Sequence, residues 1–101
     1  MKYTEILVLK DMLEKEGIPF EFKRDFYDGY RLRYPAHMGC VCSVIQHKYS
    51  YGNFQNLLEI AGLLTKEEAA RDSVLGFLTA EEVFMRIKEH WNRRVDDGKA
   101  D

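Results

Sequence analysis

Hydrophobic residues recur at helical spacing near the start of the chain. The apolar positions of this stretch are Ile6, Val8, Leu9, Met12 and Leu13. A three- and four-residue spacing places such side chains on one face of a helix. Gly17 can adopt the left-handed conformation that ends helices, and Pro19 prevents the helix from resuming. The pattern predicts a first helix from about residue 4 to residue 16.

From residue 20 onward, apolar and polar residues alternate with the two-residue period of a strand. The alternating sets are Phe20 and Phe22 with Glu21 and Lys23, then Tyr30, Leu32 and Tyr34 with Arg31 and Arg33. Between them, Asp28-Gly29 is typical of a hairpin turn, because glycine tolerates positive φ. After a turn over 35–39, a third strand is predicted over 40–49. One side of it carries Val41, Ile45, His47 and Tyr49, the other Cys40, Cys42, Val44 and Gln46. Either side could face the core.

The rest of the chain is predicted to be helical. An apolar stripe follows the turn at 51–53 and consists of Phe54, Leu57, Leu58, Ala61 and Leu64. Two later helix starts share a capping-box pattern, Thr65 with Glu68 and Thr79 with Glu82, in which each side chain caps the backbone of the other residue. The last predicted helix buries Val83, Phe84, Ile87 and Trp91.

These elements predict an α+β fold with an N-terminal helix, a three-stranded antiparallel meander, and two to three C-terminal helices packed on one sheet face. Residues 1–94 would form a single domain and residues 95–101 a flexible polar tail. The other face of the sheet would carry Arg31 and Arg33, open for contact. An exposed apolar face of the last helix, around Trp91, would suit a homodimer.

Composition narrows the classes of function. With 101 residues, 46% of them hydrophobic, the chain is long enough to bury a core. A sequence pI near 5.9 argues against broad, charge-driven DNA binding. No apolar run approaches the roughly 20 residues that cross a bilayer, and the acidic residues near the N-terminus are foreign to a signal peptide. We therefore expect a protein of the cytoplasm, with reduced cysteines and no membrane partner.

The middle of the chain differs from its flanks in charge and aromatic content. Five of the six tyrosines lie between Tyr27 and Tyr51. Residues 23–51 carry five basic and two acidic side chains, a formal charge of +3 in a chain whose total is -2. Arginine binds phosphate or carboxylate through charge-assisted hydrogen bonds, and tyrosine offers a ring for stacking. The candidate ligand-binding residues are therefore Tyr30, Arg31, Arg33, Tyr34, His47, Tyr49 and Tyr51.

This basic, aromatic segment has an alternative interpretation. Tyrosines suit strands, and arginines that alternate with them would simply occupy the solvated face. The polar run over 47–53 favours a binding role, because it falls at a strand end before a predicted helix. The N-terminal amides of such a helix attract anions.

Other chemistries have weaker patterns. His37, Cys40, Cys42 and His47 are possible zinc ligands, but cysteines one residue apart lack the usual spacing, and His47 differs from both in parity. The competing interpretation is buried cysteines with a surface histidine. A thiol nucleophile paired with a histidine has no local motif. We assign no catalytic residue, metal or cofactor, and an enzyme is not expected.

Acidic residues at the predicted helix starts allow a further hypothesis. Glu67, Glu68 and Asp72, with Glu81 and Glu82, could imitate nucleic acid in a protein-interaction inhibitor. Helix capping and the helix dipole already explain acids at these positions.

Several segments together resemble a known group of proteins. They are residues 4–10, 40–47, 50–53, 57–65 and 72–84, including Ser50-Tyr51-Gly52-Asn53. The chain resembles, over roughly residues 3 to 92, short uncharacterised proteins encoded by phages and prophages of Gram-positive bacteria. The resemblance brings no catalytic residues. It implies a small phage-encoded binding protein of the host cytoplasm, an inhibitor of host defence that sequesters an anionic signalling nucleotide or masks a host protein.

Overall fold

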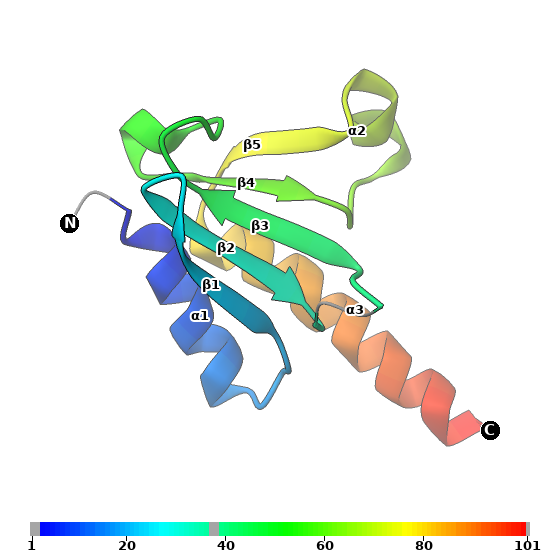
Figure 1. The fold of residues 1–101 in the computed structure, drawn as a ribbon. Helices are drawn as coiled ribbons and strands as arrows, with labels where there is room; N and C mark the ends of the chain where they lie inside the picture. The colour runs from blue at the N-terminus through cyan, green and yellow to red at the C-terminus, as the bar shows by residue number, and fades with distance from the viewer. Residues whose placement is uncertain (1–2, 37–38, 101) are drawn as a thin grey trace.

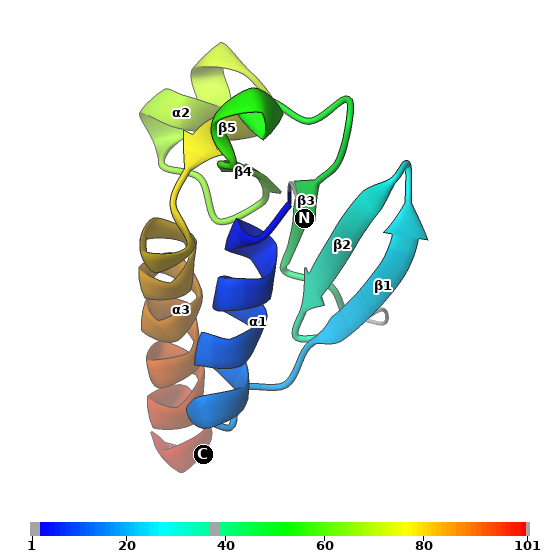
Figure 2. The same ribbon diagram turned by 90° about the vertical axis from the view of Figure 1, so that its left-hand side faces the viewer.

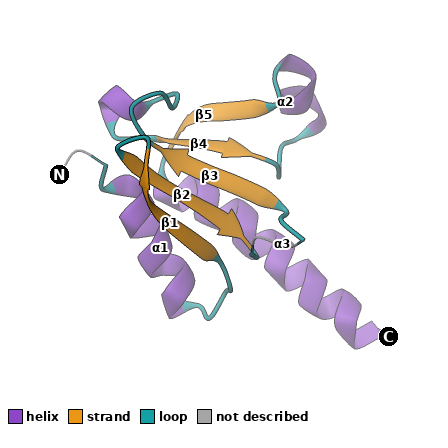
Figure 3. Cartoon of the chain, viewed as in Figure 1, coloured by secondary structure: helices purple, strands orange, loops and turns teal. Residues whose placement is uncertain are grey.

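The computed structural model describes residues 3–36 and 39–100 and contains one five-stranded antiparallel sheet with helices (Figures 1 and 3). The elements in chain order are α1 (Glu5–Lys15), β1 (Glu21–Phe26), β2 (Gly29–Tyr34), β3 (Cys42–Gln46), the 3-10 helix η1 (Asn53–Gln55), β4 (Leu58–Ala61), α2 (Lys66–Arg71), β5 (Val74–Leu78) and α3 (Ala80–Ala100). The strands lie side by side in chain order, from β1 to β5. The expected α+β class is confirmed, and the first helix, the hairpin and the third strand lie where the sequence predicts them.

The two long helices, α1 and α3, lie together on one face of the sheet (Figure 2). Between these helices and the sheet lies the core. Its members with no exposed surface include Ile6, Leu9, Leu13, Leu32, Tyr34, Val44, Leu58, Ile60, Val83 and Ile87. From Leu32 to the end of β2, and along β3, the buried side chains are the even-numbered ones. The odd-numbered side chains therefore point to the other face, which neither long helix covers.

The prediction of a three-stranded sheet was wrong, because β4 and β5 extend it to five strands. The stretch after Asn53 was expected to be a helix, but only the single 3-10 turn η1 forms there. Gly52 and Asn56 flank this turn with left-handed φ values of 92° and 58°, which a helix cannot continue through. Leu58 and Ile60 then alternate with half-buried residues, and this period of two marks a strand.

The helical prediction also failed between the two capping boxes. The box at Thr65 exists, with Thr65 and Glu68 bonded reciprocally, but α2 ends after six residues. Asp72 is already extended, and β5 then pairs with β4, placing Leu75 opposite Ile60. The side chain of Glu82 accepts a hydrogen bond from the Thr79 backbone N–H at 2.9 Å and so supports the start of α3. The caps thus located the starts of both helices, and pairing with β4 decided what lay between them.

A side chain from a distant loop caps the start of α1. The Asn56 Oδ1 atom accepts hydrogen bonds from the backbone N–H groups of Thr4 (3.0 Å) and Glu5 (3.2 Å). It also accepts one from the Gln46 Nε2 atom at 2.6 Å, and the Gln46 Oε1 atom accepts the Ile6 N–H at 2.9 Å. These bonds satisfy N–H groups that a helix start leaves unpaired, and they tie α1 to β3 and to the η1–β4 loop.

The C-terminal helix α3 spans Ala80–Ala100 and extends past the sheet (Figure 1). Its backbone includes residues 95–100, for which the sequence predicts a polar tail. None of the helices in the described part of the chain combines the length and the apolar composition that crossing a membrane requires.

Candidate functional site

The open face of the sheet carries a row of side chains that run across four strands. Lys23 on β1 pairs with Arg31 on β2, and Arg31 pairs with Ile45 on β3. Ile45 in turn pairs with Glu59 on β4. Residues opposite one another in antiparallel strands share a face. Lys23 and Arg31 therefore stand next to each other on the side of the sheet away from α1 and α3.

An irregularity in β1 adds an aromatic ring to this face. The pairing of β1 with β2 shifts register between Lys23 and Phe26, and Asp25 has a left-handed φ of 57°. Such a bulge reverses the alternation of side chains, so Phe26, opposite Gly29, lies on the open face. The guanidinium of Arg31 is 4.8 Å from the Phe26 ring centroid, and the Lys23 amine is 5.8 Å from it. Both distances are those of cation–π contacts.

Gly29 leaves room for rings to meet at this end of the sheet. A Cβ at Gly29 would collide with the backbone of Gln46 and His47. Above it, the ring centroids of Phe26 and His47 are 5.4 Å apart. Tyr27, in the left-handed hairpin turn (φ 50°), places its ring 4.8 Å from Phe26 and 5.3 Å from His47. The three rings therefore form one contact group.

His47 is held in place by its own loop. Its Nδ1 atom accepts the Tyr49 backbone N–H at 3.0 Å, which makes the imidazole neutral with the proton on Nε2. The Ser50 hydroxyl accepts the His47 N–H and donates to the His47 carbonyl oxygen. Burial lowers the pKa of His47 below its usual 6.5, while the charge of Glu59 partly opposes this shift. His47 is only 6% exposed, so it is not the surface histidine that the competing interpretation expected.

We call this group of six side chains the hairpin cluster. It consists of Lys23, Phe26, Tyr27, Arg31, His47 and Tyr49. Tyr49 joins through its ring, 5.8 Å from Tyr27 and 6.2 Å from His47. Lys48 lies beside the cluster, with its amine 3.4 Å from Asp28 and 5.2 Å from the Tyr49 ring centroid. The arrangement offers aromatic surface next to two cations.

Two of the tyrosines predicted to bind ligand lie on the covered face instead. Tyr34 is fully buried, and its hydroxyl forms a 2.7 Å hydrogen bond with Nδ1 of His90 on α3. Burial also raises the Tyr34 pKa. Tyr30 shares the side of Leu32 and stacks on Phe22 at 5.4 Å. Neither tyrosine ring lies beside Arg31 or Arg33, because side chains alternate along β2 and the tyrosines and arginines therefore point to opposite faces.

The remaining predicted residues divide between the open face and the loop after β3. Arg33 shares the open face with Arg31 and lies 4.0 Å from the Glu21 carboxylate. Tyr51 is 54% exposed, and its backbone N–H donates to Glu59 Oε1 at 2.9 Å. The structure thus brings Arg31, His47 and Tyr49 together, with Arg33 and Tyr51 farther out.

Sequence reasoning missed Lys23, Phe26 and Tyr27 as members of the cluster. Regular alternation would have put Phe26 on the same face as Phe22, and the bulge that turns it has no clear sequence signature. The sequence places Phe26 and Tyr27 between the two predicted strands, next to the Asp28-Gly29 turn, and so gives them no sheet face. The one indication in the sequence is Tyr27, a bulky aromatic residue directly before Asp28-Gly29.

The cysteine and histidine alternative finds no cluster in the structure. Cys42 is buried on the covered face, and desolvation raises its pKa to about 12. The Cys40 thiol points to the Cys42 carbonyl oxygen at 3.2 Å. His47 belongs to the opposite face of β3, and His37 lies outside the described residues. Over residues 3–36 and 39–100, no three His, Cys, Asp or Glu side chains are placed to hold a metal ion.

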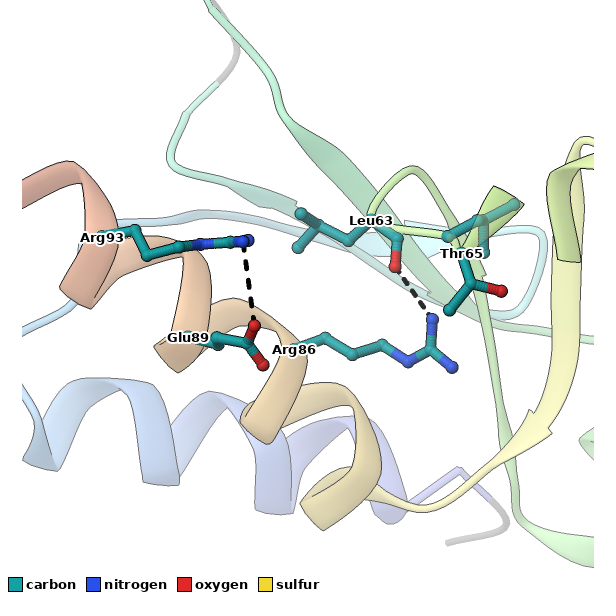
Figure 4. A pocket seen from close by; sticks show the side chains of 6 residues that line it. Leu63, Thr65, Arg86, Glu89 and Arg93 are labelled. Carbon is teal, nitrogen blue, oxygen red and sulfur yellow. Dashed lines mark hydrogen bonds and ion pairs between the residues drawn. The ribbon is translucent and has the colours of Figure 1, made fainter. Parts of the chain in front are cut away.

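A separate cavity of about 370 Å³ lies between α3 and the loop before α2 (Figure 4). Arg86 donates to the Leu63 carbonyl oxygen and forms two 2.8 Å hydrogen bonds with Glu68. Hydrogen bonds from Arg86, and then from the Thr65 backbone, lower the Glu68 pKa to about 2. Arg93 lies 3.8 Å from Glu89. The charged side chains of this cavity are paired with other groups of the protein. We therefore interpret it as a place where α3 is fixed to the loop before α2, and not as a binding site.

The hairpin cluster is therefore the strongest candidate site in the described part of the chain. It gathers rings and cations from β1, the hairpin turn, β2 and the loop after β3. Comparison of the chain with family models, with curated proteins and with solved structures found no match.

Proposed function

We propose that this protein is a non-enzymatic binding protein that captures an anionic, planar ligand of nucleotide type on the hairpin cluster. One observation carries the proposal. The open face presents Lys23 and Arg31 at the edge of a group of touching rings. A nucleotide has the two matching parts, a flat base that stacks on aromatic rings and phosphates that pair with cations.

The charges of the cluster are available for such a ligand. Within the described residues, neither Lys23 nor Arg31 has a carboxylate at ion-pair distance. Arg31 lies over the Phe26 ring, and a stacked guanidinium keeps its in-plane N–H groups free to donate. These N–H groups can therefore bind phosphate oxygens while the stacking contact holds the side chain in place.

The resemblance to short phage and prophage proteins supports a biological role for this capture. A protein that binds a signalling nucleotide without converting it would act stoichiometrically, as an inhibitor of host defence in the host cytoplasm. Masking of a host protein is the second candidate. It is favoured by the exposure of Tyr27 (57%) and Tyr49 (68%), because exposed tyrosines are common at protein interfaces.

The test is calorimetry and thermal shift with purified protein against cyclic and linear nucleotides. Inorganic phosphate and an uncharged nucleoside are tested separately. Their affinities show how much of the binding free energy comes from the phosphates and how much from the base. A ligand at about 100 times its dissociation constant stabilises the fold by about 2.7 kcal/mol, which a melting curve resolves. The double variant Lys23→Gln/Arg31→Gln should bind at least about tenfold more weakly, since each lost charge-assisted hydrogen bond contributes about 1.5–3 kcal/mol.

Lys15→Gln is the matched control, because Lys15 is an exposed cation on α1, on the covered side of the sheet. It should leave affinity unchanged. Absence of binding by every nucleotide would refute the nucleotide proposal. If the double variant and the control bind a nucleotide with equal affinity, the binding site lies outside the hairpin cluster.

A further inference from the structure

A second set of aromatic side chains surrounds a shallow depression next to the hairpin cluster. We call it the aromatic rim, and its members are Tyr49 (68% exposed), Tyr51 (54%), Phe54 (95%) and Phe77 (57%). The depression measures about 340 Å³, and its lining is completed by Lys48, Ser50, Gly52, Asn53 and Gln55. Isolated exposed apolar residues are ordinary, but a contiguous group of them marks an interaction surface. Four large rings around one depression meet that description.

The aromatic rim is built from tightly packed backbone. Gly52, with a φ of 92°, sits so close to Phe77 that a Cβ would be 3.1 Å from the Phe77 backbone. Gly76 lies directly beneath Tyr51, and the Phe77 N–H points to the Tyr51 carbonyl oxygen at 3.5 Å. Phe77 itself is left-handed, with a φ of 61°. Because this packing fixes the backbone that carries Tyr51 and Phe77, little backbone entropy would be lost there when a partner docks.

The charges beside the aromatic rim are of both signs. Lys48 and Asp28 form an exposed pair at 3.4 Å, with side-chain exposures of 45% and 78%. The other residues of the depression are uncharged. A surface that is specialised for a charged partner would carry charges of one sign only. A mixed pair beside apolar rings suits two copies of one surface, since each lysine can meet the aspartate of the other copy.

We propose that the aromatic rim is the interface of a homodimer and that its occupant is a second copy of this chain. In a two-fold interface the same patch meets itself, so the rings of one copy would pack on those of the other. Four aromatic side chains at about 150 Å² each would supply roughly 600 Å² per copy, which is at the lower end of the range of about 600–1,000 Å² per partner for standard interfaces. This surface differs from the face of α3 around Trp91 that the sequence favoured for self-association.

The decisive experiment is sedimentation equilibrium of the full chain over about 1–200 µM. The mass should rise from that of the 11.9 kDa monomer to twice that value. The variant Phe54→Ser/Phe77→Asn should shift this transition to at least tenfold higher concentration; asparagine tolerates the left-handed φ of Phe77. Met85→Ser is the matched control, because Met85 is 58% exposed but lies on α3. It should leave the transition unchanged.

A measurement on the unmodified protein guards against a variant that fails to fold. Hydroxyl-radical footprinting at low and high protein concentration should show Tyr51 and Phe54 protected at high concentration and Met85 labelled equally at both. A monomer throughout the concentration range, or a dimer that labels the rim fully, would overturn the proposal. Phe54 and Phe77 lie outside the hairpin cluster, so the double variant leaves all six side chains of that cluster in place, although the two surfaces share Tyr49.

Discussion

The two faces of the sheet use neighbouring residues of the same strands for different purposes. On the covered face, Leu32 and Val44 have no exposed surface and pack beneath the helices. On the open face, Arg31 and Ile45 are half-buried and no long helix covers them. One step along a strand therefore separates a side chain that stabilises the fold from one that is free to bind. Substitutions at adjacent positions should have effects of different kinds.

The largest expected effect contrasts Leu32→Ala with Ile45→Ala. Leu32 is fully buried, so its truncation removes apolar contacts and leaves a cavity, at a cost of about 2–5 kcal/mol. Ile45 is on the open face, where part of its surface is already in water, and we expect a smaller cost of about 1–2 kcal/mol. Urea denaturation of both variants measures the difference. Equal losses would mean that something covers the open face in the free protein.

The second largest effect concerns the cap that Asn56 provides for α1 on the covered side of the sheet. Asn56→Gly should destabilise the protein by about 2–3 kcal/mol, because it removes the cap of α1 and leaves the Gln46 amide without its partner. Glycine is chosen because it adopts the left-handed φ of 58° at this position without strain. Asn53→Gly is the matched control. Its side chain donates one exposed hydrogen bond, to the Lys48 carbonyl oxygen, and its loss should cost about 1 kcal/mol. Thermal unfolding compares the two asparagines, and similar losses would contradict the capping role.

The parts of the fold that the sequence predicted are those with local causes. Gly17 ends α1 with a φ of 68°, as expected of a helix-terminating glycine, and Thr65 and Thr79 begin α2 and α3 through contacts three residues away. The missed strands depend on distant partners. The apolar residues around Leu58 and Leu75 are spaced in a way that is compatible with helices. Hydrogen bonding between β4 and β5 makes both segments strands instead.

The candidate site divides in the same way. Arg31 and Arg33 were expected on an open face, and alternation along β2 places them there. Phe26 could not be assigned, because a single extra residue in β1 reverses its direction. Tyr34 was grouped with the arginines by proximity in sequence, although alternation along the strand already separates it from them. Reading parity strictly would have placed Tyr34 in the core and kept Arg31 outside.

The smallest expected effect is a pH dependence that arises where the open face meets the loop after β3. Burial lowers the pKa of His47, whose ring faces Phe26, Tyr27 and Tyr49 and feels the charge of Glu59. The unfolded chain takes up a proton near pH 6.5, while the folded protein does so only at lower pH. The stability that neutral His47 contributes is therefore complete above pH 6.5 and is lost as pH falls through the folded pKa.

Protonation also removes the Nδ1 acceptor of the Tyr49 N–H, so the loop that completes the hairpin cluster should loosen in the same pH range. The measurement is the free energy of unfolding of the wild type and of His47→Asn from pH 7.5 to pH 5. The two curves should converge at low pH, because the variant lacks this titration while every other titratable group remains. Parallel curves would mean that His47 has the same pKa in the folded and unfolded states. The imidazole would then be solvated in the folded protein, and the hairpin cluster would be looser than its ring contacts indicate.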